Sequence, residues 1–432
     1  MAFPRRRFLS LSGGLAAAAA TAGLAGCGSN TGRPEPGASG SAGASASAGG
    51  DVALSQWYHE YGEEGVEDAV KRYAAAYDQA EVTVKWNPGE YEKLVSAALL
   101  TDDVPDVFEY GNGPTLDMIK AGQVLDLTDT LGDAKSQFAP TVLAAMTWDD
   151  KIWAIPQTVD MQMLYYRRSM LEKAGLQPPQ TMAELITAAR ALQTKDIGGF
   201  FAGNDGGVGV LGNQLIWAAG LEQVNEEGTG VGFDTQAMYD GLAQFRELYE
   251  DGLLASASAD WFDAAPFVNE ETAMQWTGLW VLPEIQDTFG DDFGVVPFPV
   301  IGSGGRQVVP FGAFSACVSA KGANPDAAKA FVKWLWVDQE ADQVDFSNSY
   351  GTHIPAKPAL APQATKLAEG AGADAARFVT DFGHAPSLLW TPATAQAYTG
   401  ALTNVVTKGA DPKKEVAAVA ARATAELKRV NG

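Results

Sequence analysis

The apolar residues of this chain change their spacing repeatedly from residue 51 onward, between a period of two and a period of about 3.6. The first spacing is typical of strands and the second of amphipathic helices. In order, the predicted elements are a strand at 52–57, a helix at 66–77, a strand at 82–86, a helix at 91–100 and a strand from 105. Strands that alternate with helices in this way indicate mainly parallel sheets with crossover helices. The predicted fold class is therefore α/β.

Three further helices are predicted from residues that start helices. Thr181 and Glu184 have the spacing of a capping box, in which a hydroxyl and a carboxylate accept hydrogen bonds from free backbone amides. Asn324 and Asp411 each precede a proline, a pair typical of an N-cap followed by the first helical turn.

The first 26 residues have the pattern of a twin-arginine export signal. Three arginines at positions 5–7 precede an Ala-rich apolar stretch, which ends in a lipobox, Leu-Ala-Gly-Cys, at Cys27. The sequence thus predicts a signal peptide over 1–26 and a lipid-modified Cys27 that holds the mature chain on the outer face of the cell membrane. Residues 27–50 are dominated by Gly, Ser and Ala, which predicts a disordered tether.

The chain is strongly acidic, with 53 Asp and Glu against 30 Lys and Arg. Such a surface repels nucleic acid and anionic lipid headgroups, so the lipid on Cys27 is the only expected membrane contact. Only two cysteines are present, and with Cys27 lipidated, Cys317 has no thiol with which to form a disulfide. The length after residue 50 exceeds one ordinary core, which predicts two lobes.

Six segments occur in the order found in a known family. They are WYHEYGEEG, PDVFEYGNGPTLDMIKAGQVLDLT, KIWAIPQTVDMQMLYYRRSMLEKAG, AMQWTGLWVLPEI, GVVPFPVIG with VVPFGAFSACVS, and ANPDAAKAFVKWL. With these segments the chain resembles the extracytoplasmic solute-binding lipoproteins of ABC importers, in particular the sugar-binding group that includes maltose-binding protein. The resemblance implies a monomeric receptor without cofactor or metal, whose partners are a carbohydrate ligand, two permease subunits and a cytoplasmic ATPase.

The resemblance also implies a domain organisation. Two lobes would be joined by three crossings, near residues 156–160, 295–299 and 347–355. Lobe 1 would combine 51–157 with 297–348, and lobe 2 would combine 158–296 with 349–432.

The ligand site is expected where strands end, because ligands of open α/β sheets bind beyond the carboxyl ends of the strands. The residues expected at this mouth, by that rule or by the resemblance, are His59, Glu60, Tyr61, Glu109, Asp160, Asn204, Asp205, Phe311 and His353. A pyranose presents apolar C–H faces and a rim of hydroxyls, so it needs aromatic surfaces as well as carboxylate or amide partners. The expected aromatic platforms are Trp261, Trp276, Trp280 and Trp390, of which Trp280 matches the family position that stacks on a sugar.

Two other functions remain open from the sequence. A cationic solute such as a polyamine or a peptide would also suit aromatic and acidic residues together, and its affinity would fall with salt. A secreted glycoside hydrolase would likewise use paired acids and tryptophans. The Gly-rich segment 207–212 matches a dinucleotide-binding pattern, but no acidic residue closes a nucleotide unit, so it is interpreted as a tight loop. The preferred function is the binding of a mono- or oligosaccharide whose identity the sequence leaves open.

Overall fold

The computed structural model describes residues 52–431. The predicted signal peptide, Cys27 and the tether lie outside this range, so those predictions stay as they are. Within the range, strands and helices alternate along the chain, which confirms the α/β class. Among the helices of this part of the chain, none combines the length and the apolar character that a membrane span requires.

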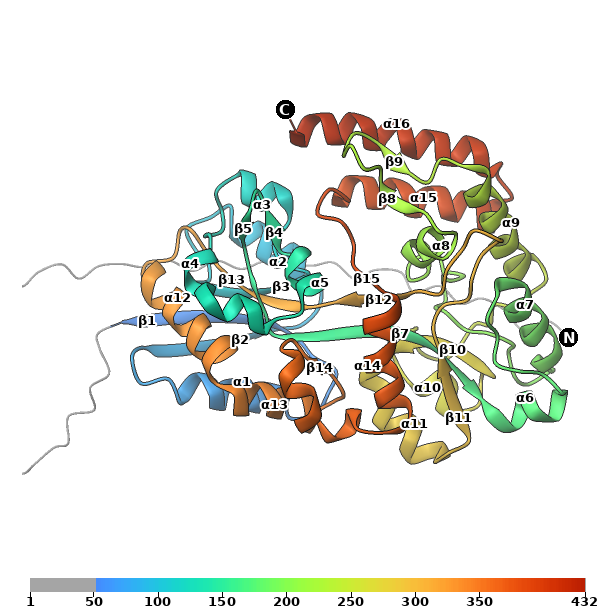
Figure 1. The fold of residues 1–432 in the computed structure, drawn as a ribbon, viewed down its shortest axis with the longest axis horizontal. Helices are drawn as coiled ribbons and strands as arrows, with labels where there is room; N and C mark the ends of the chain where they lie inside the picture. The colour runs from blue at the N-terminus through green and yellow to red at the C-terminus, as the bar shows by residue number, and fades with distance from the viewer. Residues whose placement is uncertain (1–51, 432) are drawn as a thin grey trace, which may run out of the picture. The chain divides into compact units, whose positions relative to one another are not determined.

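The first sheet has five strands in the order β2-β1-β3-β13-β6 (Figure 1). β1 (Ala53–His59) pairs in parallel with both β2 (Glu81–Asn87) and β3 (Val107–Gly111), as expected of a βαβαβ unit. β13 (Phe314–Val318) lies antiparallel between β3 and β6 (Ile155–Pro156). The N-terminal part of the chain therefore shares its sheet with a strand from a much later segment.

Helices cover both faces of this sheet. α1 (Val66–Ala75) and α13 (Glu340–Ser349) lie on one side, and α2 (Tyr91–Ala98) and α3 (Leu116–Lys120) on the other (Figure 1). Because strand side chains alternate, Leu54 and Tyr58 pack into the core with α1, whereas Trp57 packs into the core with α2. The other helical segments here are α4 (Thr128–Leu131), a 3-10 helix (Gly132–Gln137), α5 (Pro140–Ala144), α12 (Pro325–Lys333) and a π-helical turn (Trp334–Asp338).

The second sheet is organised around β7 (Thr158–Arg167), the longest strand of the described chain. Its antiparallel partners are β10 (Met274–Gly278), β11 (Phe293–Val296), β12 (Val309–Gly312) and β14 (Ile354–Pro355). β15 (Gly383–His384) joins β12 in parallel. Two hairpins lie apart from both sheets, β4 (Thr147–Trp148) with β5 (Lys151–Ile152), and β8 (Glu222–Val224) with β9 (Val231–Gly232).

The expectation of mainly parallel sheets therefore needs correction. Parallel pairing holds for β2, β1 and β3, but most pairs of the second sheet are antiparallel. The physical reason is that a strand buried on both faces has the same apolar pattern in either direction. Direction is set by how the chain returns to the sheet, which the spacing of apolar residues does not record.

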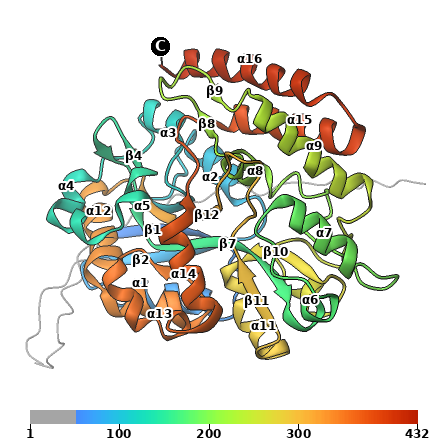
Figure 2. The same cartoon turned by 45° about the vertical axis from the view of Figure 1, so that its right-hand side comes forward.

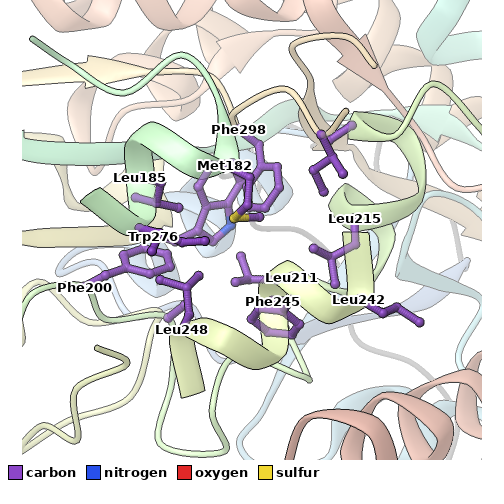
Figure 3. Packing of buried hydrophobic residues seen from close by; sticks show 14 of the residues in the cluster. Met182, Leu185, Phe200, Leu211, Leu215, Leu242, Phe245, Leu248, Trp276 and Phe298 are labelled. Carbon is purple, nitrogen blue, oxygen red and sulfur yellow. The ribbon is translucent and has the colours of Figure 1, made fainter. Parts of the chain in front are cut away.

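The second sheet also carries helices on both faces. On one face lie α6 (Arg168–Ala174), α7 (Met182–Leu192), α8 (Gly212–Ala218), α9 (Gln236–Glu250) and α15 (Pro392–Lys408). On the other lie α10 (Ala265–Val268), α11 (Leu282–Phe289) and α14 (Gly370–Phe382), next to the 3-10 turns Leu279–Val281, Pro358–Gln363 and Thr365–Leu367. Figure 3 shows the first core, in which Trp276 lies among Phe200, Leu185 and Phe298. α16 (Pro412–Asn431) packs outside, against α15 and α9 (Figures 1 and 2).

The chain passes between the two sheets three times. The first and third passages, from β6 to β7 and from α13 to β14, fall where they were expected. The second falls between β12 and β13, at residues 312–314, and not at 295–299. The reason is that Phe298, Ile301 and Val308 are buried in the core of the second sheet. The chain therefore stays in the second lobe over these residues and crosses only after them. The remaining lobe limits stay predictions.

The predicted helix starts are found at the expected residues. The Thr181 hydroxyl accepts a hydrogen bond from the Glu184 amide at 3.2 Å, and the Glu184 carboxylate accepts one from the Thr181 amide at 3.1 Å. Asp411 caps α16 by accepting a hydrogen bond from the Lys414 amide at 2.9 Å. Asn324 stands at the N-cap of α12, but its amide donates to the Ala53 carbonyl in place of capping the helix.

Candidate functional site

Three adjoining cavities lie between the two sheets. Cavity A has a volume of about 610 Å³ and is lined by His59, Tyr61, Asp160, Trp280 and His353, among others. Cavity B, of about 360 Å³, shares Asp160, Trp280 and Phe314 with cavity A. Cavity C, of about 240 Å³, shares Gly111, Asn112 and Pro386 with cavity B. Residues that follow β1 and β3 line these cavities, as expected for the carboxyl ends of strands in an α/β sheet.

Glu109 lies beneath cavity A and holds two of its lining residues in place. The carboxylate is 1% exposed and accepts hydrogen bonds from the His59 amide at 2.7 Å and from the Tyr61 hydroxyl at 2.9 Å. The His59 ring also contacts the same carboxylate through Nδ1. Burial and the nearby Glu109 charge raise the pKa of Tyr61 well above its usual value, so this hydroxyl remains a donor. Glu109 is therefore corrected from a ligand contact to a positioning residue, because its side chain is enclosed by the groups it holds.

His353 joins two carboxylates at the edge of cavity A. Its Nδ1 lies 2.5 Å from Asp160 Oδ1, and its Nε2 lies 3.3 Å from Glu63 Oε1. Burial disfavours the imidazolium, but Asp160 and Glu63 outweigh this effect and raise the pKa of His353 to about 10. Burial alone would raise the pKa of Glu63, because it disfavours the charged carboxylate. Contact with His353 outweighs this effect and lowers the pKa of Glu63 below its usual value. The raised pKa of His353 therefore keeps its imidazole protonated at neutral pH, between two acidic side chains.

Trp280 forms the wall between cavities A and B. Its indole N–H donates to the Phe262 carbonyl at 2.9 Å, and its ring meets that of Trp261 edge-on at a centroid distance of 5.9 Å. Gly278 lies directly under the ring, where an added Cβ would come within 2.1 Å of it. Trp280 is only half-buried, so one face of the indole is open to the cavities.

Trp276 is a core residue, and its prediction as a sugar platform is corrected. It is 0% exposed, and its ring meets Phe298 edge-on in the core of the second sheet (Figure 3). Its indole N–H donates to Gln162 Oε1 at 2.9 Å, and Gln214 donates to the same oxygen at 3.1 Å. Trp276 therefore contacts Gln162, which lines cavity B, and does not line that cavity itself.

Asn204 and Asp205 are exposed, shape loops and line none of the cavities A, B and C, so ligand contact by either residue stays a prediction. The Asn204 side chain exchanges hydrogen bonds with the backbone of Ala257 and donates to the Ala259 carbonyl at 3.0 Å. Asp205 accepts hydrogen bonds from the amides of Gly207 and Gly209 at 3.0 and 2.9 Å. The Gly-rich segment is thus a tight loop whose shape Asp205 fixes, as interpreted from the sequence.

The other predicted residues are distributed over several hollows. Trp261 and Phe311 line cavity B, and Trp390 lines cavity C. Glu60 is exposed and lines a separate hollow beside α2, together with His59. Direct contact with the ligand therefore remains a prediction for each of these residues.

Sequence reasoning missed several residues that line cavity A. Phe314 stacks on His59 with ring centroids 4.2 Å apart, and Tyr350 and Asp263 line the same cavity. Phe314 follows β12 at the second crossing, which the sequence placed too early. Asp263 lies two residues after Trp261, a proximity that could have drawn attention to it. Within residues 52–431, no group of three or more His, Cys, Asp or Glu side chains is arranged to hold a metal ion.

Two sheets with helices on both faces, three chain crossings and cavities at the strand ends define a two-lobed α/β binding protein. The particular family follows from comparison with known proteins. Residues 61–340 match the family of bacterial extracellular solute-binding proteins, and the chain belongs to this family.

Relatives differ in how much of their length is matched. The diacetylchitobiose binding protein DasA of Streptomyces coelicolor is 26% identical over 291 residues, 64% of this chain and 65% of that protein. The galactooligosaccharide-binding protein of Bacillus subtilis is 22% identical over 400 residues, 87% of this chain and 89% of that protein. The chain spans about a third, 34%, of the length of the binding proteins it matches in Brucella abortus.

Solved structures share the fold at low sequence identity. The GacH receptor of Streptomyces glaucescens, solved without ligand and with acarbose, has a TM-score of 0.72 and 21% identity, covering 87% of this chain and 98% of that one. Maltose-bound MalE3 of T. maritima has a TM-score of 0.71 and 20% identity, covering 88% and 100%. At this identity the likeness confirms the two-lobed fold.

Proposed function

We propose that this protein is the extracytoplasmic receptor of an ABC importer and binds a mono- or oligosaccharide in cavities A and B. The observation that carries the proposal is the position of Trp280, whose half-buried ring lies between two cavities that are lined by apolar surface together with a few polar groups. An indole face suits the apolar C–H face of a pyranose, and the surrounding groups suit its hydroxyls. Asp160 supplies a carboxylate and Gln162 a side-chain amide to the lining of cavity B.

The relatives support this choice of ligand. Two of them are a diacetylchitobiose binding protein and a galactooligosaccharide-binding protein, and the structural neighbours include complexes with maltose and acarbose. The ligand would be bound unchanged, since delivery to a permease requires binding and release without a covalent step. Closure of the lobes around the ligand would mark the loaded receptor, because only a ligand that touches both lobes favours the closed state.

The proposal includes the assembly inferred from the sequence. The receptor is a monomer held on the outer face of the cell membrane by lipid on Cys27, and it delivers the sugar to two permease subunits driven by a cytoplasmic ATPase. Metabolic labelling with palmitate tests the anchor, with a Cys27→Ser variant as control. Label that persists in the variant would contradict lipidation at this residue.

A cationic solute is the second candidate, favoured by the charge of cavity A. Five carboxylates line it, those of Glu63, Glu64, Asp160, Asp263 and Glu284. The affinity for a cation held by these groups would fall with ionic strength, whereas affinity for a neutral sugar would hardly change.

Calorimetric titration of a panel of neutral oligosaccharides and polyamines, at low and high salt, tests the proposal. Trp280→Ala should weaken binding of the active sugar more than tenfold, the equivalent of about 1.4 kcal/mol, because a central aromatic platform is lost. Trp153→Ala is a matched control, since Trp153 is also half-buried and also donates to a backbone carbonyl, Trp148 O at 3.0 Å, but lines none of the three cavities.

Three outcomes would contradict the proposal. Unchanged affinity in Trp280→Ala would remove this ring from the site. Tight binding of a polyamine that weakens with salt would favour the cationic ligand. Hydrolysis of any glycoside by the purified protein would favour the glycoside hydrolase.

A further inference from the structure

The last turn of α16 contacts α3. The Arg429 guanidinium donates to both Asp117 carboxylate oxygens, at 2.9 and 3.0 Å, and to Glu426 at 2.7 Å. The Lys120 ammonium contacts the Val430 carbonyl. α16 extends from above α9 toward α3 in both views (Figures 1 and 2).

A small apolar cluster lies beneath these polar contacts. Leu116, Leu427 and Val430 are 1–2% exposed and form a cluster separate from the main cores, with Trp148 packed against it. Leu116 lies in α3, which follows β3 of the first sheet, and Trp148 lies in β4 of the neighbouring hairpin. Leu427 and Val430 belong to α16. The cluster therefore joins elements of the two lobes, and we name it, with the Asp117–Arg429 pair, the latch.

The latch borders the ligand cavities without lining cavity A or B. Leu116 and Asp117 line cavity C, and Thr391 at the start of α15 lines the same cavity from the second lobe. Cavity C continues into cavity B through Gly111 and Asn112. Any separation of the lobes at this end would break the latch and open cavity C to solvent.

We propose that the latch stabilises the arrangement in which the two lobes enclose the cavities, and that its residues are positioning residues that slow ligand release. The inference rests on the proposed function. An apolar cluster and an ion pair formed between the lobes shift the population toward the closed state, whether or not ligand is present. The latch thus sets residence time through residues that do not stack on the sugar.

Dissociation kinetics test the inference. Arg429→Ala should raise the ligand dissociation rate about two- to fivefold, because a half-exposed ion pair contributes modestly. Leu427→Ala and Leu116→Ala remove apolar contacts from opposite lobes, and each should raise the rate further than Arg429→Ala does. Combined, they should raise it less than the product of their separate effects, because both break one interface.

Matched controls separate the latch from general stability. Arg190 is as exposed as Arg429, 52%, and also pairs with two carboxylates, Glu247 and Asp251, but within one lobe. Val419 of α16 is buried against its own lobe. Arg190→Ala and Val419→Ala should leave the dissociation rate unchanged even where the melting temperature falls. If they raise it as much as the latch variants do, the inference is overturned.

A measurement without ligand keeps the inference separate from the proposed function. Spin labels on Leu100→Cys of the first lobe and Tyr249→Cys of the second, in a Cys27→Ser background, report the distance between lobes. Arg429→Ala and Leu427→Ala should widen the distance distribution of the ligand-free protein, and Arg190→Ala should not. An unchanged distance distribution in the latch variants would contradict the latch inference. A wild-type protein that binds no sugar would contradict the proposed function alone.

Discussion

Substitution of Gly278 by alanine should weaken ligand binding although the residue touches no ligand. A Cβ at this position would lie 2.1 Å from Trp280 Cζ3 and 2.2 Å from Cε3 and Cη2. Carbon atoms in van der Waals contact are roughly 3.5–4.0 Å apart, so the indole must retreat by more than about 1 Å. The Trp280 ring is half-buried and can move, so the substitution should displace the platform and leave the fold intact.

The magnitude follows from what holds the ring. Its hydrogen bond to the Phe262 carbonyl at 2.9 Å contributes about 0.5–1.5 kcal/mol, and its edge-on contact with Trp261 contributes about 0.5–1.5 kcal/mol. If both contacts are lost when the ring is displaced, the cost to ligand binding is about 1–3 kcal/mol, which weakens affinity roughly 5- to 150-fold.

Calorimetry with the active sugar, together with thermal melting, checks this prediction. Gly62→Ala is the control, because Gly62 lines the same cavity and a Cβ there would meet no atom within 4 Å. The control should bind like the wild type. If Gly278→Ala also binds like the wild type, Trp280 is not a platform in this position and the reasoning is refuted.

Two further predictions concern buried groups. Trp276→Phe should lower the free energy of unfolding by about 0.5–1.5 kcal/mol, measured in urea, because the Gln162 oxygen loses one of its two donors, the indole N–H at 2.9 Å, and keeps Gln214. His353 should make stability depend on pH, because its pKa is raised to about 10 in the folded protein from 6.5. The His353 imidazolium therefore contributes fully to the free energy of unfolding below pH 6.5, and this contribution is lost as pH rises toward 10. Urea titrations should show the free energy of unfolding decline across this window, and His353→Gln should remove the decline.

The fold could be predicted from the sequence as far as local periodicity determines it. The elements of the first βαβαβ unit and the capping box at Thr181 follow from spacing and hydrogen-bonding chemistry within a few residues. The antiparallel pairing around β7 could not be predicted, because it depends on which distant segments return to that strand. The second crossing was placed too early for the same reason, since Phe298 and Val308 are buried by partners far away in sequence.

Trp276 and Trp280 show which part of the site could not be predicted from the sequence. They are four residues apart in the same segment. Trp276 lies within β10 and faces a core that is closed by helices on that side of the sheet. Trp280 lies beyond the strand end, on a 3-10 turn at the cavities. The sequence identifies the residue type, but whether the ring is covered depends on helices from elsewhere in the chain.

The acidic groups of cavity A favour a neutral ligand over a cation when their partners are considered. Asp160 and Glu63 already share the His353 imidazolium, and Asp263 accepts a hydrogen bond from the Ala265 amide at 2.8 Å. The other two lining carboxylates are exposed, where water and salt screen their charge. A cation would therefore compete with His353 for the buried carboxylates, whereas a hydroxyl can donate to their remaining oxygens without displacing it. Together with the open face of Trp280, this arrangement makes an uncharged, hydroxyl-rich ring the better match for the cavity.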